Sequence, residues 1–182
     1  WKSDNFKAYL ENLTDRNSIL IKSYEDQLIV RMGYSYNYNS ANNQTRTSSN
    51  RNSYSIRVNL EEAGNLLYGA SKAIHTSPKE DKGYVIANIP FAQYVKGDFD
   101  FAHNWNIDQR NSFVFHIGMG IAYPYGNSQV LPFEKRYFSG GPNSVRGWSV
   151  RSLGPGSYKG TNDNMNYINH SGDIKLDMNI EY

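Results

Sequence analysis

The side chains that could carry acid–base or metal chemistry are scattered along this sequence. Four histidines lie far apart: His75, His103, His116 and His170. They lack the ligand spacing of a metal site, and His116 is better explained as a packing or hydrogen-bonding group. Asp98 and Asp100 share one face of a predicted strand, where a solvated wall explains them better than acid–base catalysis. No serine sits in a GxSxG elbow and the chain has no cysteine, so we predict no enzyme activity, no metal site and no cofactor.

The most specific spacing belongs to a glycine-rich stretch, Leu131–Trp148, which reads LPFEKRYFSGGPNSVRGW. The pair Gly140–Gly141 precedes a proline, and this combination predicts a tight turn. Gly147 is expected to let the backbone at Arg146 approach another surface closely, and Trp148 supplies a large apolar anchor. The stretch is therefore typical of a loop that docks onto another part of the protein, with an arginine at its tip.

Two other interpretations of this stretch concern its glycines and its arginine. A phosphate-binding P-loop requires the pattern GxxxxGK[ST], but no lysine follows these glycines. A lone Arg146 can also be an ordinary solvated side chain, which is the commonest environment of an arginine. The surrounding elements decide between solvation and docking.

Five stretches of the sequence alternate apolar and polar residues with a period of two, which predicts β-strands. They cover residues 27–39, 53–61, 92–106, 112–125 and 172–182. Each has an aliphatic and aromatic face and a polar or charged face. In the fourth stretch the polar face consists mostly of small residues such as Gly118 and Gly120, which leave room for another segment to lie against it. Residues 62–74 are predicted as one or two helical turns.

The length and chemistry of these strands favour a membrane β-barrel over a soluble sandwich. Strands of about nine to fifteen residues match or exceed the span of a tilted membrane strand and are long for a sandwich. Tyrosines and tryptophans gather near strand ends, as an interfacial aromatic girdle requires. In a barrel the apolar face would meet lipid and the polar face would line a wet lumen. The predicted fold class is therefore all-β, an antiparallel transmembrane β-barrel present here as a partial barrel of about five strands with a long inward-folding loop.

Composition limits the remaining classes. The chain has 15 tyrosines but only 38% hydrophobic residues, as expected when each strand is apolar on one face only. A formal net charge of +2 gives no electrostatic basis for nucleic-acid binding. No apolar run approaches the length of a transmembrane helix. A soluble β-rich adhesin or binding domain remains an alternative, since abundant tyrosine and asparagine would suit it as well.

Residues Pro132–Trp148, which follow a predicted strand and precede a long polar connection, resemble the signature loop of the outer-membrane protein assembly superfamily. This superfamily includes the BamA-type and TamA-type insertases and the two-partner secretion transporters. Its motif is Val-Arg-Gly followed by an aromatic residue, and the matching residues are Val145, Arg146, Gly147 and Trp148. The preceding Tyr137–Gly141 also matches, and residues 172–182 are similar to the family's next strand.

The resemblance implies a barrel of about sixteen strands, of which this chain would hold five consecutive ones. Residues 1–182 would form one partial outer-membrane barrel domain, with a long loop at residues 126–171 that folds back into the barrel. The chain begins at Trp1 without an initiator methionine and ends at Tyr182 inside a predicted strand, so we expect a piece of a larger protein. The strands of the lateral seam and the periplasmic substrate-binding domains would lie outside it.

The resemblance also implies a function and a set of partners. The protein would assemble or insert other β-barrel proteins in the outer membrane of a Gram-negative type cell. Its partners would be outer-membrane lipid, the remaining barrel strands and periplasmic domains of the parent protein, unfolded outer-membrane client proteins and, as a further expectation, accessory lipoproteins. No nucleic acid is expected. A two-partner-type secretion transporter or a passive pore of the same fold is the alternative.

The last expectation is an ion pair between Arg146 and Glu181 inside the barrel. A guanidinium in a partly desolvated lumen needs a carboxylate that can accept two of its hydrogen bonds. Glu181 points inward by the period of two, and the resemblance favours the same glutamate. Asp173 and Asp177 are rival partners, with Asp177 the closer rival. A solvent-exposed Arg146, with Glu181 paired to Lys175 or unpaired, is the alternative.

Overall fold

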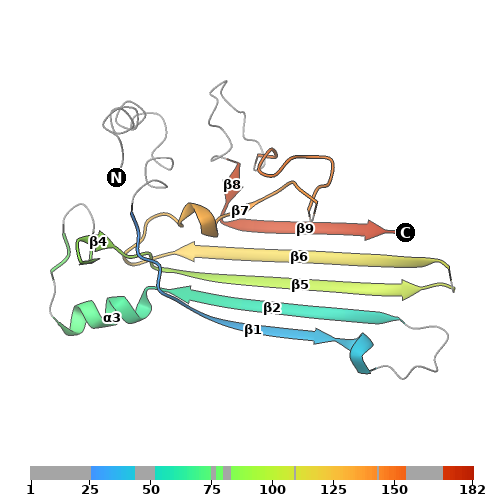
Figure 1. Ribbon diagram of the computed structural model, residues 1–182, viewed down its shortest axis with the longest axis horizontal. Coiled ribbons are helices and arrows are strands. Elements are labelled where there is room, and N and C mark those ends of the chain that lie inside the picture. The colour runs from blue at the N-terminus through green and yellow to red at the C-terminus, as the bar shows by residue number, and fades with distance from the viewer. Residues whose placement is uncertain are drawn as a thin grey trace.

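The dominant element is a five-stranded antiparallel sheet with the strand order β1-β2-β5-β6-β9 (Figure 1). The computed structural model describes residues 26–43, 52–74, 77–79, 83–108, 110–142, 144–154 and 170–182. The strands of the sheet are β1 (Arg31–Asn39), β2 (Ser53–Ala63), β5 (Tyr94–Asn106), β6 (Ser112–Pro124) and β9 (Ile174–Glu181). Within the described residues β1 and β9 are its two edges, so the sheet is open. The prediction of an all-β, partial antiparallel barrel is confirmed.

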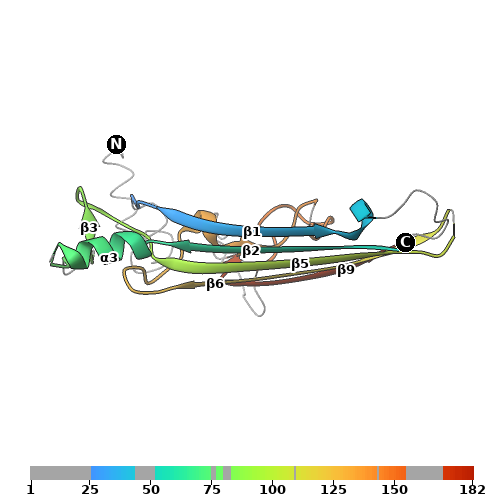
Figure 2. The ribbon, with the colours of Figure 1, turned by 90° about the horizontal axis from the view of Figure 1, so that it is seen from below.

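Smaller elements flank this sheet. They are the helices η1 (Ser40–Asn43), α3 (Asn65–Ala73) and η2 (Phe133–Lys135), and the short strands β3 (Val85–Ile86), β4 (Ile89–Pro90), β7 (Tyr137–Phe138) and β8 (Ser171–Gly172). β3 pairs with β4, and β7 pairs with β8. Both ribbon views show α3 beyond one end of the sheet, opposite the β5–β6 turn (Figures 1 and 2). Among the described residues, no helix combines the length and apolar character needed to cross a membrane.

The cross-strand register sorts the side chains of the sheet onto two faces. One transverse row consists of Tyr36, Val58, Phe99, Met119 and Leu176. The adjacent row, one residue along each strand, consists of Ser35, Asn59, Asp98, Gly120 and Lys175. Because successive residues of a strand point to opposite faces, the first row belongs to an apolar face and the second to a polar face. The two-faced strands predicted from the alternation are confirmed.

The second strand extends further than its pattern predicted. β2 runs to Ala63, so Glu62 lies in the strand and on its apolar face, whereas residues 62–74 were predicted as helical turns. Gly64 ends the strand with a left-handed φ of +82°, and its N–H donates to the carbonyl of Val30 at 3.1 Å. This glycine lets the chain leave the sheet, and α3 begins only after it.

The first predicted strand is interrupted near its beginning. β1 starts only at Arg31, four residues after the predicted start at Gln27. Leu28 instead pairs with the segment around β4: its N–H donates to the carbonyl of Pro90 at 2.9 Å, and its carbonyl accepts from the N–H of Ala92 at 3.0 Å. The alternating pattern continues through this change of partner, which is why the pattern did not reveal it.

A small apolar core lies on the polar face, near the end of the sheet that carries α3. Its buried members are Ala63, Ala92, Tyr94, Ala122 and Leu131. Ile29 and Tyr137 pack against it. Ile29 is the residue that breaks the alternation of the first stretch, and this contact explains the exception. The polar face is therefore covered here by the residues that follow β6.

The start of the long loop (residues 126–171) is held by the buried side chain of Gln93, which is 3% exposed. The side-chain oxygen Oε1 of Gln93 accepts a hydrogen bond from the backbone N–H of Asn127 at 2.9 Å. The backbone N–H of Gln93 donates to the hydroxyl of Ser128 at 2.8 Å. The amide of Asn127 donates to the carbonyls of Tyr84 at 3.0 Å and Phe91 at 2.9 Å. These bonds direct the loop back over the polar face.

Candidate functional site on the polar face

The long loop contacts the polar face of the sheet in two places. We call residues 131–139 the root and residues 144–148 the tip. The root makes polar contacts with β2 and β5, and the tip contacts β9. Residues 143 and 155–169 of the loop lie outside the described residues.

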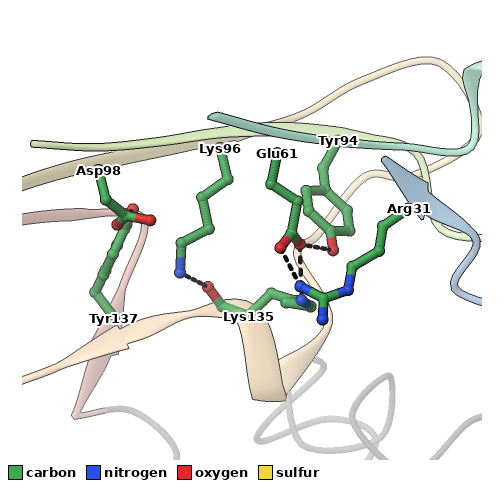
Figure 3. Close-up of polar contacts among 7 residues, drawn as sticks. All are labelled: Arg31, Glu61, Tyr94, Lys96, Asp98, Lys135 and Tyr137. Atoms are coloured by element: carbon green, nitrogen blue, oxygen red, sulfur yellow. Dashed lines mark hydrogen bonds and ion pairs between the residues drawn. The ribbon is translucent and has the colours of Figure 1, made fainter. Parts of the chain in front are cut away.

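Glu61 of β2 is the centre of the root. Its carboxylate accepts hydrogen bonds from Nζ of Lys135 at 2.7 Å and from the hydroxyl of Tyr94 at 2.6 Å, and it pairs with Arg31 at 2.5 Å (Figure 3). The side chains of Glu61 and Lys135 are only 16% and 18% exposed. Limited exposure reduces screening by water, so this pair contributes more than an ordinary surface ion pair. The alternation placed Glu61 on the polar face, but sequence reasoning assigned it no partner.

Tyr137 of β7 is the second part of the root. Its hydroxyl donates to Oδ1 of Asp98 at 2.5 Å and lies 3.3 Å from the carbonyl oxygen of Gly97 (Figure 3). Nζ of Lys96 lies 4.1 Å from the centroid of the tyrosine ring, a cation–π distance. Burial, followed by the hydrogen bond to Asp98, raises the pKa of Tyr137 above its usual value. The hydroxyl therefore remains protonated and acts as a donor.

The ring of Tyr137 lies against Gly120 of β6. A Cβ atom at Gly120 would lie 2.5 Å from Cζ of the ring and 2.6 Å from its hydroxyl oxygen, closer than such atoms approach one another. The missing side chain is thus required by the aromatic ring of the loop. The inference that small residues on this face leave room for another segment is confirmed at this position.

Arg136 joins the root to the strand that follows the loop. Its Nε lies 3.2 Å from Oδ1 of Asp173, and its side chain is 11% exposed. Beside it, β7 pairs with β8, with Tyr137 opposite Gly172. One of the two rival partners of Arg146 is therefore already engaged by the root.

The chain turns at the glycine pair between root and tip, as predicted. Gly140 and Gly141 have φ values of +97° and +95°, a region that favours glycine. The N–H of Gly141 donates to the carbonyl of Trp148 at 2.8 Å, and the N–H of Trp148 donates to the carbonyl of Val145 at 3.1 Å. These bonds close a turn that carries Arg146 between its ends.

Arg146 contacts Glu181 of β9. Nη2 of the arginine lies 2.5 Å from Oε1 of the glutamate. Asp177, the closer rival, instead pairs with Lys175 at 2.7 Å. The tip arginine is thus matched with one particular carboxylate although another lies on the same face of the same strand.

Three expectations for the tip differ from the structure. The side chains of Arg146 and Glu181 are 69% and 47% exposed, so their ion pair does not occupy the partly desolvated environment that we expected. A Cβ atom at Gly147 would meet nothing within 4 Å among the described residues, so no close approach occurs there. Trp148 is 54% exposed and is therefore not a buried anchor. The physical reason is that, among the described residues, the open sheet covers the tip from one side only.

A double-mutant cycle measures how strongly the tip is held. We expect Arg146→Ala and Glu181→Ala each to lower the free energy of unfolding by about 1 kcal/mol or less, because water screens an exposed pair. The double variant should lose little more than either single variant, since both remove one interaction. Urea unfolding of residues 1–182 in detergent, the state in which this exposure applies, provides the measurement, with Arg110→Ala, in the β5–β6 turn, as the control. Strictly additive losses would show that the two side chains are not coupled.

The histidines take separate positions. His116 lies on the polar face with Nε2 3.5 Å from Oδ1 of Asp100, and His103 lies on the apolar face opposite Phe115. Nδ1 of His170 lies 3.0 Å from the carbonyl oxygen of Arg151, and His75 lies outside the described residues. Within the part of the chain that the structure describes, no group of three or more candidate ligands could hold a metal ion.

Comparisons with known proteins identify the family of the chain. The family model of the Omp85 superfamily domain matches residues 2–182. The outer membrane protein assembly factor BamA of Neisseria meningitidis serogroup B is 30% identical over 87 residues, which cover 46% of this chain and 10% of the relative. The match thus spans about a tenth of that protein's length. No solved structure matches the chain significantly.

Proposed function

This chain belongs to the Omp85 superfamily, and on that premise we propose that it forms part of the barrel of an outer-membrane protein that assembles other β-barrel proteins. Its family and its similarity to BamA make it a member of an outer-membrane assembly and transport family. Assembly of β-barrel proteins is the activity that the name of this relative describes.

The observation that carries the proposal is the docked loop. Its root is held through Lys135 and Tyr137, and its tip is held through Arg146. A loop fixed at two points on the polar face would brace the barrel from inside. Such a brace suits a barrel whose wall must deform while a client strand is added, because the root contacts lie on the inner strands β2 and β5 and need not break when other strands separate.

A passive pore is less consistent with the same geometry. The polar face of a pore lines a water-filled channel. Here the root lies directly on that face, and its aromatic ring touches the backbone at Gly120. A loop in this position narrows the lumen. A two-partner-type secretion transporter remains the second candidate, because the resemblance of the loop extends to that class.

The proposed partners follow from the assembly role. They are outer-membrane lipid on the apolar face, the remaining strands and periplasmic domains of the parent protein, unfolded β-barrel clients, and accessory lipoproteins. The proposed location is the outer membrane of a Gram-negative bacterium. Within the part of the chain that the structure describes, β1 and β9 are open edges, which supports the need for further strands, because an unpaired edge within lipid leaves costly unsatisfied backbone groups.

Reconstitution of the full-length protein tests the proposal. Phosphatidylcholine vesicles that contain it should fold a urea-denatured β-barrel client into a protease-protected form faster than empty vesicles do. Vesicles that contain an unrelated closed barrel serve as the control. Equal folding rates in all three would contradict the assembly role. Translocation of a soluble client into the vesicle lumen, without faster barrel folding, would favour the secretion transporter.

The membrane-facing side of the sheet leads to a second prediction. Phe101→Lys places a charge on the apolar face near the middle of β5, and we expect it to destabilise the folded protein by about 2–4 kcal/mol. Ala102→Lys, one residue further along β5, places the same charge on the polar face and should cost far less. Urea unfolding in lipid vesicles compares the two variants. Equal destabilisation would mean that the two faces are wrongly assigned.

A further inference from the structure

The apolar face of the sheet contains a groove. A groove of about 500 Å³ crosses β2, β5, β6 and β9 on the side opposite the long loop. Its side-chain lining is apolar and includes Leu60, Phe99, Met119, Ile121, Ile174 and Leu176. Several of these walls are open to the surroundings, with Ile121 60% exposed and Leu176 59% exposed. No side chain of the described residues fills the groove.

Gly97 of β5 creates the hollow. It lies in the row between Leu60 and Ile121, where every other position of the row carries a side chain. A Cβ atom at Gly97 would meet only Cδ2 of Leu60, at 3.5 Å, which is ordinary van der Waals contact. The backbone φ angle of Gly97 is not positive either. Neither the backbone nor the packing of the described residues therefore requires a glycine here.

A glycine inside a strand lowers stability and often marks a place where a ligand approaches closely. Gly120, one row away on the opposite face, accommodates the ring of Tyr137. Gly97 faces away from the loop, so its ligand must come from the medium that the apolar face contacts. For a member of the Omp85 superfamily this medium is the hydrocarbon interior of a membrane.

We propose that this groove holds a single acyl chain of a membrane lipid. The chain would lie over the backbone at Gly97, between Leu60 and Ile121. Its ester end would lie toward Tyr123, in the next row of the same face toward α3 and two residues along β6 from Ile121, where an exposed tyrosine suits the membrane interface. Its methyl end would lie toward Phe99. A groove lined by apolar side chains offers such a chain close contact without burying any polar group.

A photo-reactive lipid tests this inference in the full-length protein. The probe is phosphatidylcholine with a diazirine in the middle of one acyl chain, diluted into phosphatidylcholine vesicles that contain the protein. After illumination, mass spectrometry maps the adducts. We expect labelling of Leu60, Phe99 and Ile121 to exceed, several-fold, that of apolar-face residues outside the groove such as Ile56 and Phe101. Uniform labelling of the apolar face would overturn the proposal.

Filling the hollow provides the matched variant. Gly97→Leu should abolish the excess labelling, whereas Val95→Leu, on the same face of the same strand but outside the groove lining, should retain it. Excess labelling that persists in Gly97→Leu would overturn the proposal. If Gly97→Leu does not fold, Gly97→Ala, which the 3.5 Å clearance accommodates, should reduce the excess, and an unchanged pattern there would overturn the proposal equally. The result does not depend on whether the protein assembles clients.

Discussion

Glu61→Gln should release the root of the long loop at a cost of about 3 kcal/mol, the lower end of the range for breaking a buried ion pair. Glutamine keeps the shape of the side chain but removes the negative charge that Lys135 and Arg31 share. Both cations then lie close together without their counter-charge. Their partial exposure is the reason for expecting the lower end of the range.

Trypsin offers a direct readout, because the root contains Lys135 and Arg136, whose side chains are 18% and 11% exposed. A loss of about 3 kcal/mol in local stability corresponds to an increase of about a hundredfold in cleavage from the opened state. The matched control is Glu134→Gln, which removes the same charge from an exposed neighbour of Lys135. The trypsin cleavage rate of each folded variant is divided by the rate for the same variant unfolded. This removes any effect of the substitution on cleavage of the unfolded chain itself. Equal protection of the two variants would contradict the central role of Glu61.

Gly120→Ala should displace Tyr137 and destabilise the docked loop by about 1–3 kcal/mol, the usual cost of overpacking. The added methyl group would lie 2.5 Å from the tyrosine ring. The ring must move, and its hydroxyl then loses the hydrogen bond to Asp98. Urea unfolding of the full-length protein, together with trypsin cleavage at the root, measures the effect.

Gly33→Ala is the matched control for this change. Gly33 lies on the polar face of β1, and a Cβ atom there would meet only a backbone oxygen of Leu60 at 3.4 Å. The same substitution, on the same face, should therefore leave the root protected. If Gly120→Ala is as stable and as well protected as Gly33→Ala, the contact between ring and glycine does not hold the loop.

The destabilisation expected at the root from Glu61→Gln or Gly120→Ala is larger than that expected at the tip. The difference reflects how firmly each part of the loop is held. The root combines low exposure with three partners for the Glu61 carboxylate, whereas the Arg146–Glu181 pair is 69% and 47% exposed. Screening by water weakens the second contact more than the first. We therefore expect the root to remain docked under conditions that release the tip.

The alternating strands, the polar and apolar faces and the glycine turn could all be predicted from the sequence. Each depends on local rules: the period of two decides which face a side chain takes, and a glycine pair permits positive φ. The same rules placed Glu61, Asp98 and Gly120 on one face. They also placed Glu181 and Asp177 together, and for this reason the alternation alone could not choose between them as partners of Arg146.

Only the tertiary structure decided which of these residues meet. Lys135 reaches Glu61 across 74 positions of sequence, and Tyr137 reaches Asp98 across 39. Such pairs depend on the strand register and on where the loop crosses the sheet, and no local pattern encodes either. The exposure of Arg146 and Trp148 was missed for the same reason. Burial depends on what covers a side chain in space, and the open sheet of this chain covers the tip from one side only, whereas packing from the sheet and the loop together encloses the root.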